Sequence, residues 1–158
     1  EMVTGATAPY FPARMRNSFF ESSRAAIATI AGLLVSEEIR TPEGLTAVYS
    51  SCPRALLDAV YDWSRFNTLP RAYEWIRREI RQKRVSPAEL VDVTIKYGNQ
   101  GTARRMGALL DREGVTGAVL KKLERILRPT TSLIPWIPNQ PKRGKANKRW
   151  GVILNEKE

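Results

Sequence analysis

The sequence has no histidine and a single cysteine, and these two shortages exclude several kinds of chemical site. Without histidine the chain cannot build Ser-His or Cys-His nucleophilic sites, or a zinc site with histidine ligands. Cys52 has no second cysteine with which to form an intrachain disulfide, which favours an intracellular compartment. Because unpaired cysteines are usually small buried residues, we expect Cys52 to be buried; a reactive thiol is the alternative.

Long apolar runs and glycine-rich phosphate loops are also missing. No stretch of about 18 apolar residues could form a transmembrane helix. The first residues lack the basic and apolar regions of a signal peptide. Neither a Walker loop nor a dinucleotide-binding glycine pattern is present. We therefore expect a cytoplasmic protein with no membrane partner, no cofactor and no metal site.

Acidic residues are scarce relative to basic ones, with 16 Asp and Glu against 26 Lys and Arg and a formal net charge of +10. This excess favours an acidic partner such as nucleic acid or an acidic protein; a solvated basic surface without a specific partner is the alternative. The candidate binding residues fall into two groups. The first group lies on predicted helices whose opposite faces are apolar: Arg77, Arg78, Arg81, Arg84, Arg104 and Arg105. The second group lies on a loop near the end of the chain: Lys142, Arg143, Lys145, Lys148 and Arg149.

The second group is predicted to form an exposed basic loop, here called the tongue (residues 138–149). Pro138, Pro141 and Gly144 prevent a helix in this stretch. Its lysines and arginines could contact phosphates, and Gly144 allows the backbone to approach closely. A loop that serves only solubility is the alternative.

Strand-like segments, 130–137 and 150–154, flank the tongue and are candidates for pairing with each other. Each carries a tryptophan, Trp136 and Trp150. Because large aromatic residues are mostly buried, we expect the two rings to hold the base of the tongue and to pack against each other. Stacking on nucleic-acid bases is the alternative.

The order of helix and turn signals predicts an α+β fold. Four to five helices between residues 53 and 128 should pack with a small mixed or antiparallel sheet built from segments near 25–50 and 130–154. The clearest helix start is Ser86-Pro87-Ala88-Glu89, an N-cap serine followed by proline and by the glutamate of a capping box. Thr41-Pro42-Glu43-Gly44 predicts a tight turn between two strands within 33–50.

Apolar residues at helical spacing predict the core. The residues expected to be buried are Leu56, Leu57, Val60, Ile76, Leu110, Leu120, Leu123 and Leu127. We expect residues 1–49 to be a β-rich or irregular section, the remnant of a longer N-terminal region. Residues 50–158 should form the helical part and the terminal strands.

Two carboxylates, Asp58 and Asp62, lie four residues apart and would share one helix face. Paired carboxylates can perform acid–base chemistry or hold Mg²⁺, so a small metal-dependent nucleic-acid-processing enzyme is one hypothesis. The other interpretation is that both are surface acids, solvated or paired with arginine.

Three short motifs, in order, resemble one known family. Ser51-Cys52-Pro53-Arg54-Ala55-Leu56-Leu57-Asp58 resembles the S-P-E-R-A-L-L-D signature of AbiEi-type transcriptional regulators, the antitoxins of type IV toxin–antitoxin systems. The stretch from Gly101 to Asp111 is similar to the family's R-L-G-x-L-L-E helix. The stretch from Gly144 to Asn155, with Arg149-Trp150 inside it, is similar to the closing pattern G-x-x-N-x-R-W-x-x-x-x-N.

The resemblance covers residues 50–155 and implies a non-enzymatic regulator. Family members join a DNA-binding winged helix-turn-helix to a C-terminal domain that is tied to neutralising a nucleotidyltransferase-like toxin. The chain would correspond mainly to that C-terminal domain, with the toxin as its partner and DNA as a further one. A plain protein-interaction module is the remaining alternative.

Overall fold

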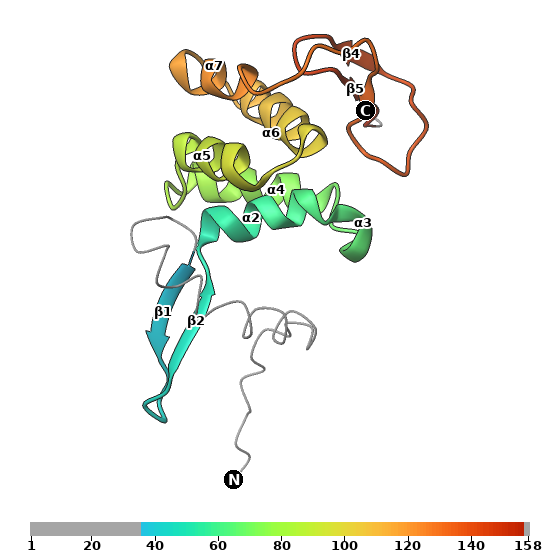
Figure 1. Ribbon diagram of the computed structural model, residues 1–158. Coiled ribbons are helices and arrows are strands. Elements are labelled where there is room, and N and C mark those ends of the chain that lie inside the picture. The colour runs from blue at the N-terminus through green and yellow to red at the C-terminus, as the bar shows by residue number, and fades with distance from the viewer. Residues whose placement is uncertain (1–35, 157–158) are drawn as a thin grey trace. The chain divides into compact units, whose positions relative to one another are not determined.

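The computed structural model describes residues 36–156 of the chain (Figure 1). They lie in a compact unit that runs from Leu34 to Glu158. The described part contains six helices and two small sheets, which confirms the predicted α+β class. The strand expected within 25–35 lies outside the described residues, and the division of the chain at residue 49 stays a prediction.

Two antiparallel strands, β1 (Ser36–Arg40) and β2 (Thr46–Ser50), form the predicted hairpin. The amide of Thr41 donates to the carbonyl of Leu45 at 2.8 Å, and the amide of Gly44 donates to the carbonyl of Thr41 at 2.9 Å. Gly44 has a φ of +80°, a backbone conformation that favours glycine, so the turn chemistry of the sequence is confirmed.

Six helices follow in the order that the apolar spacing predicts, with one short addition (Figure 1). Helix α5 lies between α2 and α7, and α6 packs against all three. The added element is α3, a single turn that the sequence did not indicate. The helices are α2 (Cys52–Tyr61), α3 (Trp63–Phe66), α4 (Arg71–Arg81), α5 (Pro87–Tyr97), α6 (Gln100–Arg112) and α7 (Ala118–Glu124).

Helix α5 begins as its sequence predicts. The hydroxyl of Ser86 accepts the amide of Glu89, and the carboxylate of Glu89 accepts the amide of Ser86, which completes the capping box. The helix stops at Gly98, where an added Cβ would lie 2.6 Å from the carbonyl oxygen of Thr94. The position therefore requires glycine because the carbonyl of Thr94 leaves no room for a side chain. The backbone of Gly98 is itself extended, a conformation that any residue can adopt.

Seven of the eight residues expected in the core are buried, and Leu127 is only half-buried. The predicted last helix was too long, because α7 ends at Glu124. Beyond it the amides of Ile126 and Leu127 bond to carbonyls three residues back, as in a 3₁₀ turn. Leu127 therefore lies in a tighter turn beyond α7, where it packs against the edge of the core.

The prediction for Cys52 is also wrong. Cys52 is exposed, because it is the first residue of α2 and lies on the side away from the core. Its neighbour Pro53 is buried instead, together with Leu56 and Leu57.

The C-terminal strands form their own three-stranded mixed sheet, in the order β3 (Ile134–Pro135), β5 (Val152–Leu154), β4 (Lys145–Asn147). Strand β5 pairs parallel with β3 and antiparallel with β4. The expected single sheet, with strands from both ends of the chain, is therefore wrong in this part of the protein: β1 and β2 pair with each other and belong to a separate sheet.

One ring fixes this sheet to the helices. Trp150, in the turn between β4 and β5, is buried with 1% exposure. A Cβ placed on Gly107 of α6 would lie only 2.1 Å from the ring atom Cε3 of Trp150. The indole thus lies directly on the helix backbone, and Gly107 is the residue that makes room for it.

None of the helices in residues 36–156 combines the length and the apolar character needed to cross a membrane.

We expect Gly107→Ala to lower the free energy of unfolding by about 1–3 kcal/mol, the usual cost of overpacking a core. Gly101→Ala is the matched control on the same helix, because its Cβ would meet its nearest atom at 3.4 Å. Alanine is the better helix former, so the control should be as stable as the wild type or gain up to about 1 kcal/mol. Urea denaturation of both variants measures the difference, and equal stability would refute the close contact.

Candidate polyanion-binding surface

The N-terminal side of the tongue is held by Trp136. Its ring stacks on Tyr73 of α4 with centroids 3.9 Å apart and an angle of 16° between the planes. The hydroxyl of Tyr73 donates to the carbonyl of Trp136 at 2.8 Å, and the indole of Trp136 donates to Glu156 at 2.5 Å. Burial raises the pKa of Tyr73 far above its ordinary value, so its hydroxyl stays protonated and able to donate.

The C-terminal side is held by Trp150, whose indole N–H donates to the carboxylate of Asp111 at 3.0 Å. The other oxygen of Asp111 accepts Nη1 of Arg149 at 2.7 Å. Both tryptophans are therefore buried as predicted, but they do not stack on each other as expected. Trp136 packs on α4 and Trp150 on α6, so the base of the tongue is attached to two helices.

A third anchor is Asn155, whose side chain acts as a clamp on the start of the tongue. Its Oδ1 accepts the amide of Ile137 at 2.8 Å. Its Nδ2 donates to the carbonyls of Ile137, Gln140 and Pro141 at 2.9, 3.3 and 3.1 Å. The backbone of the tongue is thus fixed without any involvement of its charged side chains.

The charged side chains of the tongue are exposed, as predicted. Among the described side chains of residues 40–156, no carboxylate oxygen lies within 4.0 Å of the cationic nitrogen atoms of Lys142, Arg143, Lys145 or Lys148. The tongue is not a loop throughout, because Lys145 begins β4. Gly144, just before it, has Leu154 so close that a Cβ would lie 1.9 Å from its carbonyl oxygen.

Arg149 differs from its neighbours in the tongue. Its Nε donates to Glu124 of α7 at 2.5 Å, in addition to its bond with Asp111. The hydrogen bond to Glu124, and the charges of both carboxylates, raise the pKa of Arg149. Arg149 therefore joins the tongue to α6 and α7, and little of its charge remains for a partner.

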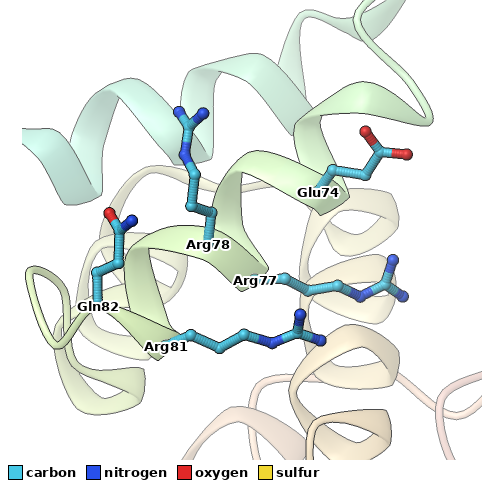
Figure 2. Close-up of a pocket in the computed structure, with 5 residues that line it drawn as sticks. All are labelled: Glu74, Arg77, Arg78, Arg81 and Gln82. Atoms are coloured by element: carbon cyan, nitrogen blue, oxygen red, sulfur yellow. The ribbon is translucent and has the colours of Figure 1, made fainter.

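The arginines predicted on α4 are also largely neutralised. Figure 2 shows Arg77 and Arg81 extending to one side of α4 and Arg78 to another. Arg77 and Arg81 share Glu113, with nitrogen–oxygen distances of 2.7 and 3.6 Å. The two pairs tie α4 to the end of α6.

On the other side of α4, Arg78 and Arg84 share Glu79, at 3.4 and 2.6 Å. The hydrogen bond from Arg84 lowers the pKa of the Glu79 carboxyl. Because that carboxyl is favoured when ionised, its stabilising effect is lost as the pH falls through the lowered pKa. With two arginines to each carboxylate, α4 keeps a smaller excess of positive charge than the tongue.

The placement of Arg104 and Arg105 on an exposed basic surface is wrong. Both lie on α6 and are buried, with 8% and 7% exposure. Arg105 directs Nε and Nη2 to the carbonyl of Pro135 in β3, and Arg104 directs Nη1 to the carbonyl of Ser132. Burial lowers the pKa of Arg105. Helix periodicity alone does not show that the sheet covers this face of α6.

The carboxylate pair consists of Asp58 on α2 and Asp62 at the end of that helix, and Asp58 is engaged by an arginine. Asp58 accepts two hydrogen bonds from Nε of Arg54, at 2.9 and 3.0 Å. Partial burial raises the pKa of Asp58 despite this arginine. Nowhere in the described part of the chain do three or more Cys, Asp or Glu side chains gather as ligands for a metal ion.

The second and third sequence motifs are joined in space. Gly107 and Asp111 come from the second motif, and they contact Trp150 and Arg149 of the third. Asn147 accepts the amide of Trp150 at 3.3 Å, and Asn155 is the clamp described above. The motif residues therefore hold the C-terminal sheet against α6, and the exposed lysines of the tongue are attached to this packed region.

No family model matches the chain, and neither a curated protein nor a solved structure does. The resemblance to the AbiEi family therefore rests on the three sequence motifs alone.

Sequence reasoning missed two residues that position the tongue, Asp111 and Asn155. In the sequence, both are recognisable only as positions within the second and third motifs. Their role depends on partners 39 and up to 18 residues away in sequence, the Trp150 indole and the backbone of Ile137. No periodic or local signal reports such contacts.

Arg105→Ala should lower the free energy of unfolding, because it leaves the carbonyl of Pro135 without its charged donor. Hydrogen bonds to charged groups contribute about 1.5–3 kcal/mol, which is the loss we expect. Arg143→Ala removes the same charge from the tongue and should change stability by less than about 0.5 kcal/mol. Chemical denaturation measures both, and equal effects would contradict the structural role of Arg105.

Proposed function

We propose that this chain is a non-enzymatic regulatory domain that binds an acidic macromolecule through its tongue. The observation that carries this proposal concerns four cations of the tongue, Lys142, Arg143, Lys145 and Lys148. They are exposed, have no carboxylate partner among the described side chains of residues 40–156, and lie on a loop with a firmly held base. Cations that are already paired must lose one partner to gain another, whereas these four exchange only water and counterions.

The firm base favours binding over simple solubility. A solubilising loop needs charge alone, but this one is fixed by two tryptophans and the Asn155 clamp. A loop whose backbone is already fixed loses less conformational entropy when a partner binds, and this smaller loss favours affinity. The tongue therefore presents its charges from a preorganised position.

The motif resemblance suggests the kind of regulator. In an AbiEi-type antitoxin, this domain would contact a nucleotidyltransferase-like toxin, DNA, or both. The support for this kind of regulator is the presence of the three motifs in the family's order. Nothing in residues 36–156 favours the nuclease alternative, since Asp58 is paired with Arg54.

Triple charge reversal, Lys142→Glu with Arg143→Glu and Lys145→Glu, should weaken binding to a DNA duplex or to a purified nucleotidyltransferase-like toxin. The melting temperature should change little, because exposed charges contribute less than about 1 kcal/mol each. For DNA, the log–log slope of affinity against salt should become shallower by about 0.9 for each phosphate that the variant no longer neutralises. Fluorescence anisotropy across a salt series provides the measurement.

The matched control is a second triple reversal with the same change in net charge, Arg65→Glu with Arg71→Glu and Lys83→Glu. These cations are exposed and lie outside the tongue. The control should keep most of the affinity. If both triples weaken binding equally, only the overall charge matters and the tongue is a solubilising loop.

A further inference from the structure

We propose that a groove beside the tongue binds a phosphate group. The groove lies between the segment that follows α7 and the β4–β5 turn, and its volume is about 410 Å³. Its polar lining consists of Arg104, Arg128, Lys148, Arg149, Glu124 and Thr130. This inference rests on the proposed function in one respect only, the source of the phosphate. That source is the backbone of a nucleic acid that is bound by the tongue.

The floor of the groove is the guanidinium of Arg104. This side chain is more than nine-tenths buried, yet no carboxylate among the described residues pairs with it. Its Nη1 donates to the carbonyl of Ser132, at 3.1 Å. No side-chain nitrogen or oxygen that is fully buried in this part of the chain lacks a partner, so any nitrogen of Arg104 without a hydrogen bond keeps some contact with solvent. Arg104 lines the groove, and we infer that this contact lies there.

Gly151 keeps this guanidinium accessible. Its φ is +66°, and a Cβ at this position would lie 3.5 Å from Cζ and from Nη1 of Arg104. Any side chain there would cover the arginine. The glycine thus leaves the groove open beside a cation that pairs with no carboxylate among the described residues.

The rim supplies further positive charge. Arg128 and Lys148 are exposed, and neither forms an ion pair within residues 36–156. Arg149 is engaged by Asp111 and Glu124, so Glu124 is largely neutralised where it borders the groove. Three cations from separate segments therefore face one space, and an anion would relieve their mutual repulsion.

Phosphate fits this arrangement better than a single carboxylate. It carries more acceptor oxygens, and guanidinium groups bind it through parallel N–H bonds while a lysine adds a point charge. Lys148 belongs to both the groove and the tongue. A nucleic acid lying along Lys142, Arg143 and Lys145 could therefore place one backbone phosphate over Arg104.

The test compares Arg128→Gln with Arg125→Gln. Both remove one exposed cation from the segment at the end of α7, but only Arg128 lines the groove. Two probes are titrated into each variant: inorganic phosphate, followed by amide chemical shifts, and a DNA duplex, followed by anisotropy across a salt series. Arg104→Gln is added, with its melting temperature measured, because Arg104 also bonds Ser132.

We expect Arg128→Gln to weaken duplex binding by about tenfold, the loss of one charge-assisted hydrogen bond, and to reduce the salt slope by about one. Shifts caused by phosphate should centre on Gly151 and Thr130 in the wild type and vanish in Arg128→Gln and Arg104→Gln. Arg125→Gln should keep these shifts and most of the duplex affinity, because an exposed charge without direct contact is screened by salt.

If Arg128→Gln and Arg125→Gln behave alike with both probes, the proposal that the groove binds phosphate is refuted. This holds whatever the result for the tongue variant. The tongue triple variant separates the two proposals, since it should lose duplex affinity and keep the phosphate shifts. If the triple variant binds the duplex normally while the groove variants lose the phosphate shifts, the proposed function fails and the groove stands. Loss of phosphate binding with unchanged duplex affinity would support the groove as a site for free phosphate.

Discussion

The close contact between the Trp150 ring and the backbone of α6 at Gly107 is the constraint on which the C-terminal half of this protein depends. It brings the β4–β5 turn down onto the helix, where Asp111 accepts both the indole of Trp150 and the guanidinium of Arg149. The same contact places Gly151 over Arg104, which opens the groove. A sheet with strands of two or three residues has few hydrogen bonds of its own, so this side-chain packing determines where it lies.

Charge alone would have made all the basic clusters look equivalent. The structure separates them by what surrounds each cation. The arginines of α4, with Arg84 just after it, share two carboxylates. Arg105 is buried against the carbonyl of Pro135, whereas Arg104 bonds the carbonyl of Ser132 and also lines the groove. The lysines of the tongue are exposed. An ion pair or a buried position uses up the attraction that a partner would otherwise gain. We therefore expect the tongue and the groove, which share Lys148, to contribute most to binding.

Local chemistry was the part of the fold that could be predicted. The capping box at Ser86 and Glu89, the turn at Gly44 and the apolar stripes of α2, α4 and α6 all depend on neighbours within a few residues, and the structure confirms them. Predictions failed where contacts between residues distant in the sequence determine burial or strand pairing. Leu127 packs at the edge of the core and is only half-buried, because α7 ends before it. Cys52 is exposed because the core lies on the other side of α2, and the strands of the two ends form separate sheets.

By itself, the sequence determined the α+β class, the start of α5, seven of the buried core residues and the exposed, basic character of the tongue, since each follows from spacing, capping and proline or glycine chemistry. Only the tertiary structure decided which cations are available. It paired Arg77 and Arg81 with Glu113, buried Arg105 against Pro135 and left Arg104 open beneath Gly151. The reason is that pairing and burial depend on groups up to 47 residues apart in the chain, whose approach is set by packing and leaves no periodic trace in the sequence.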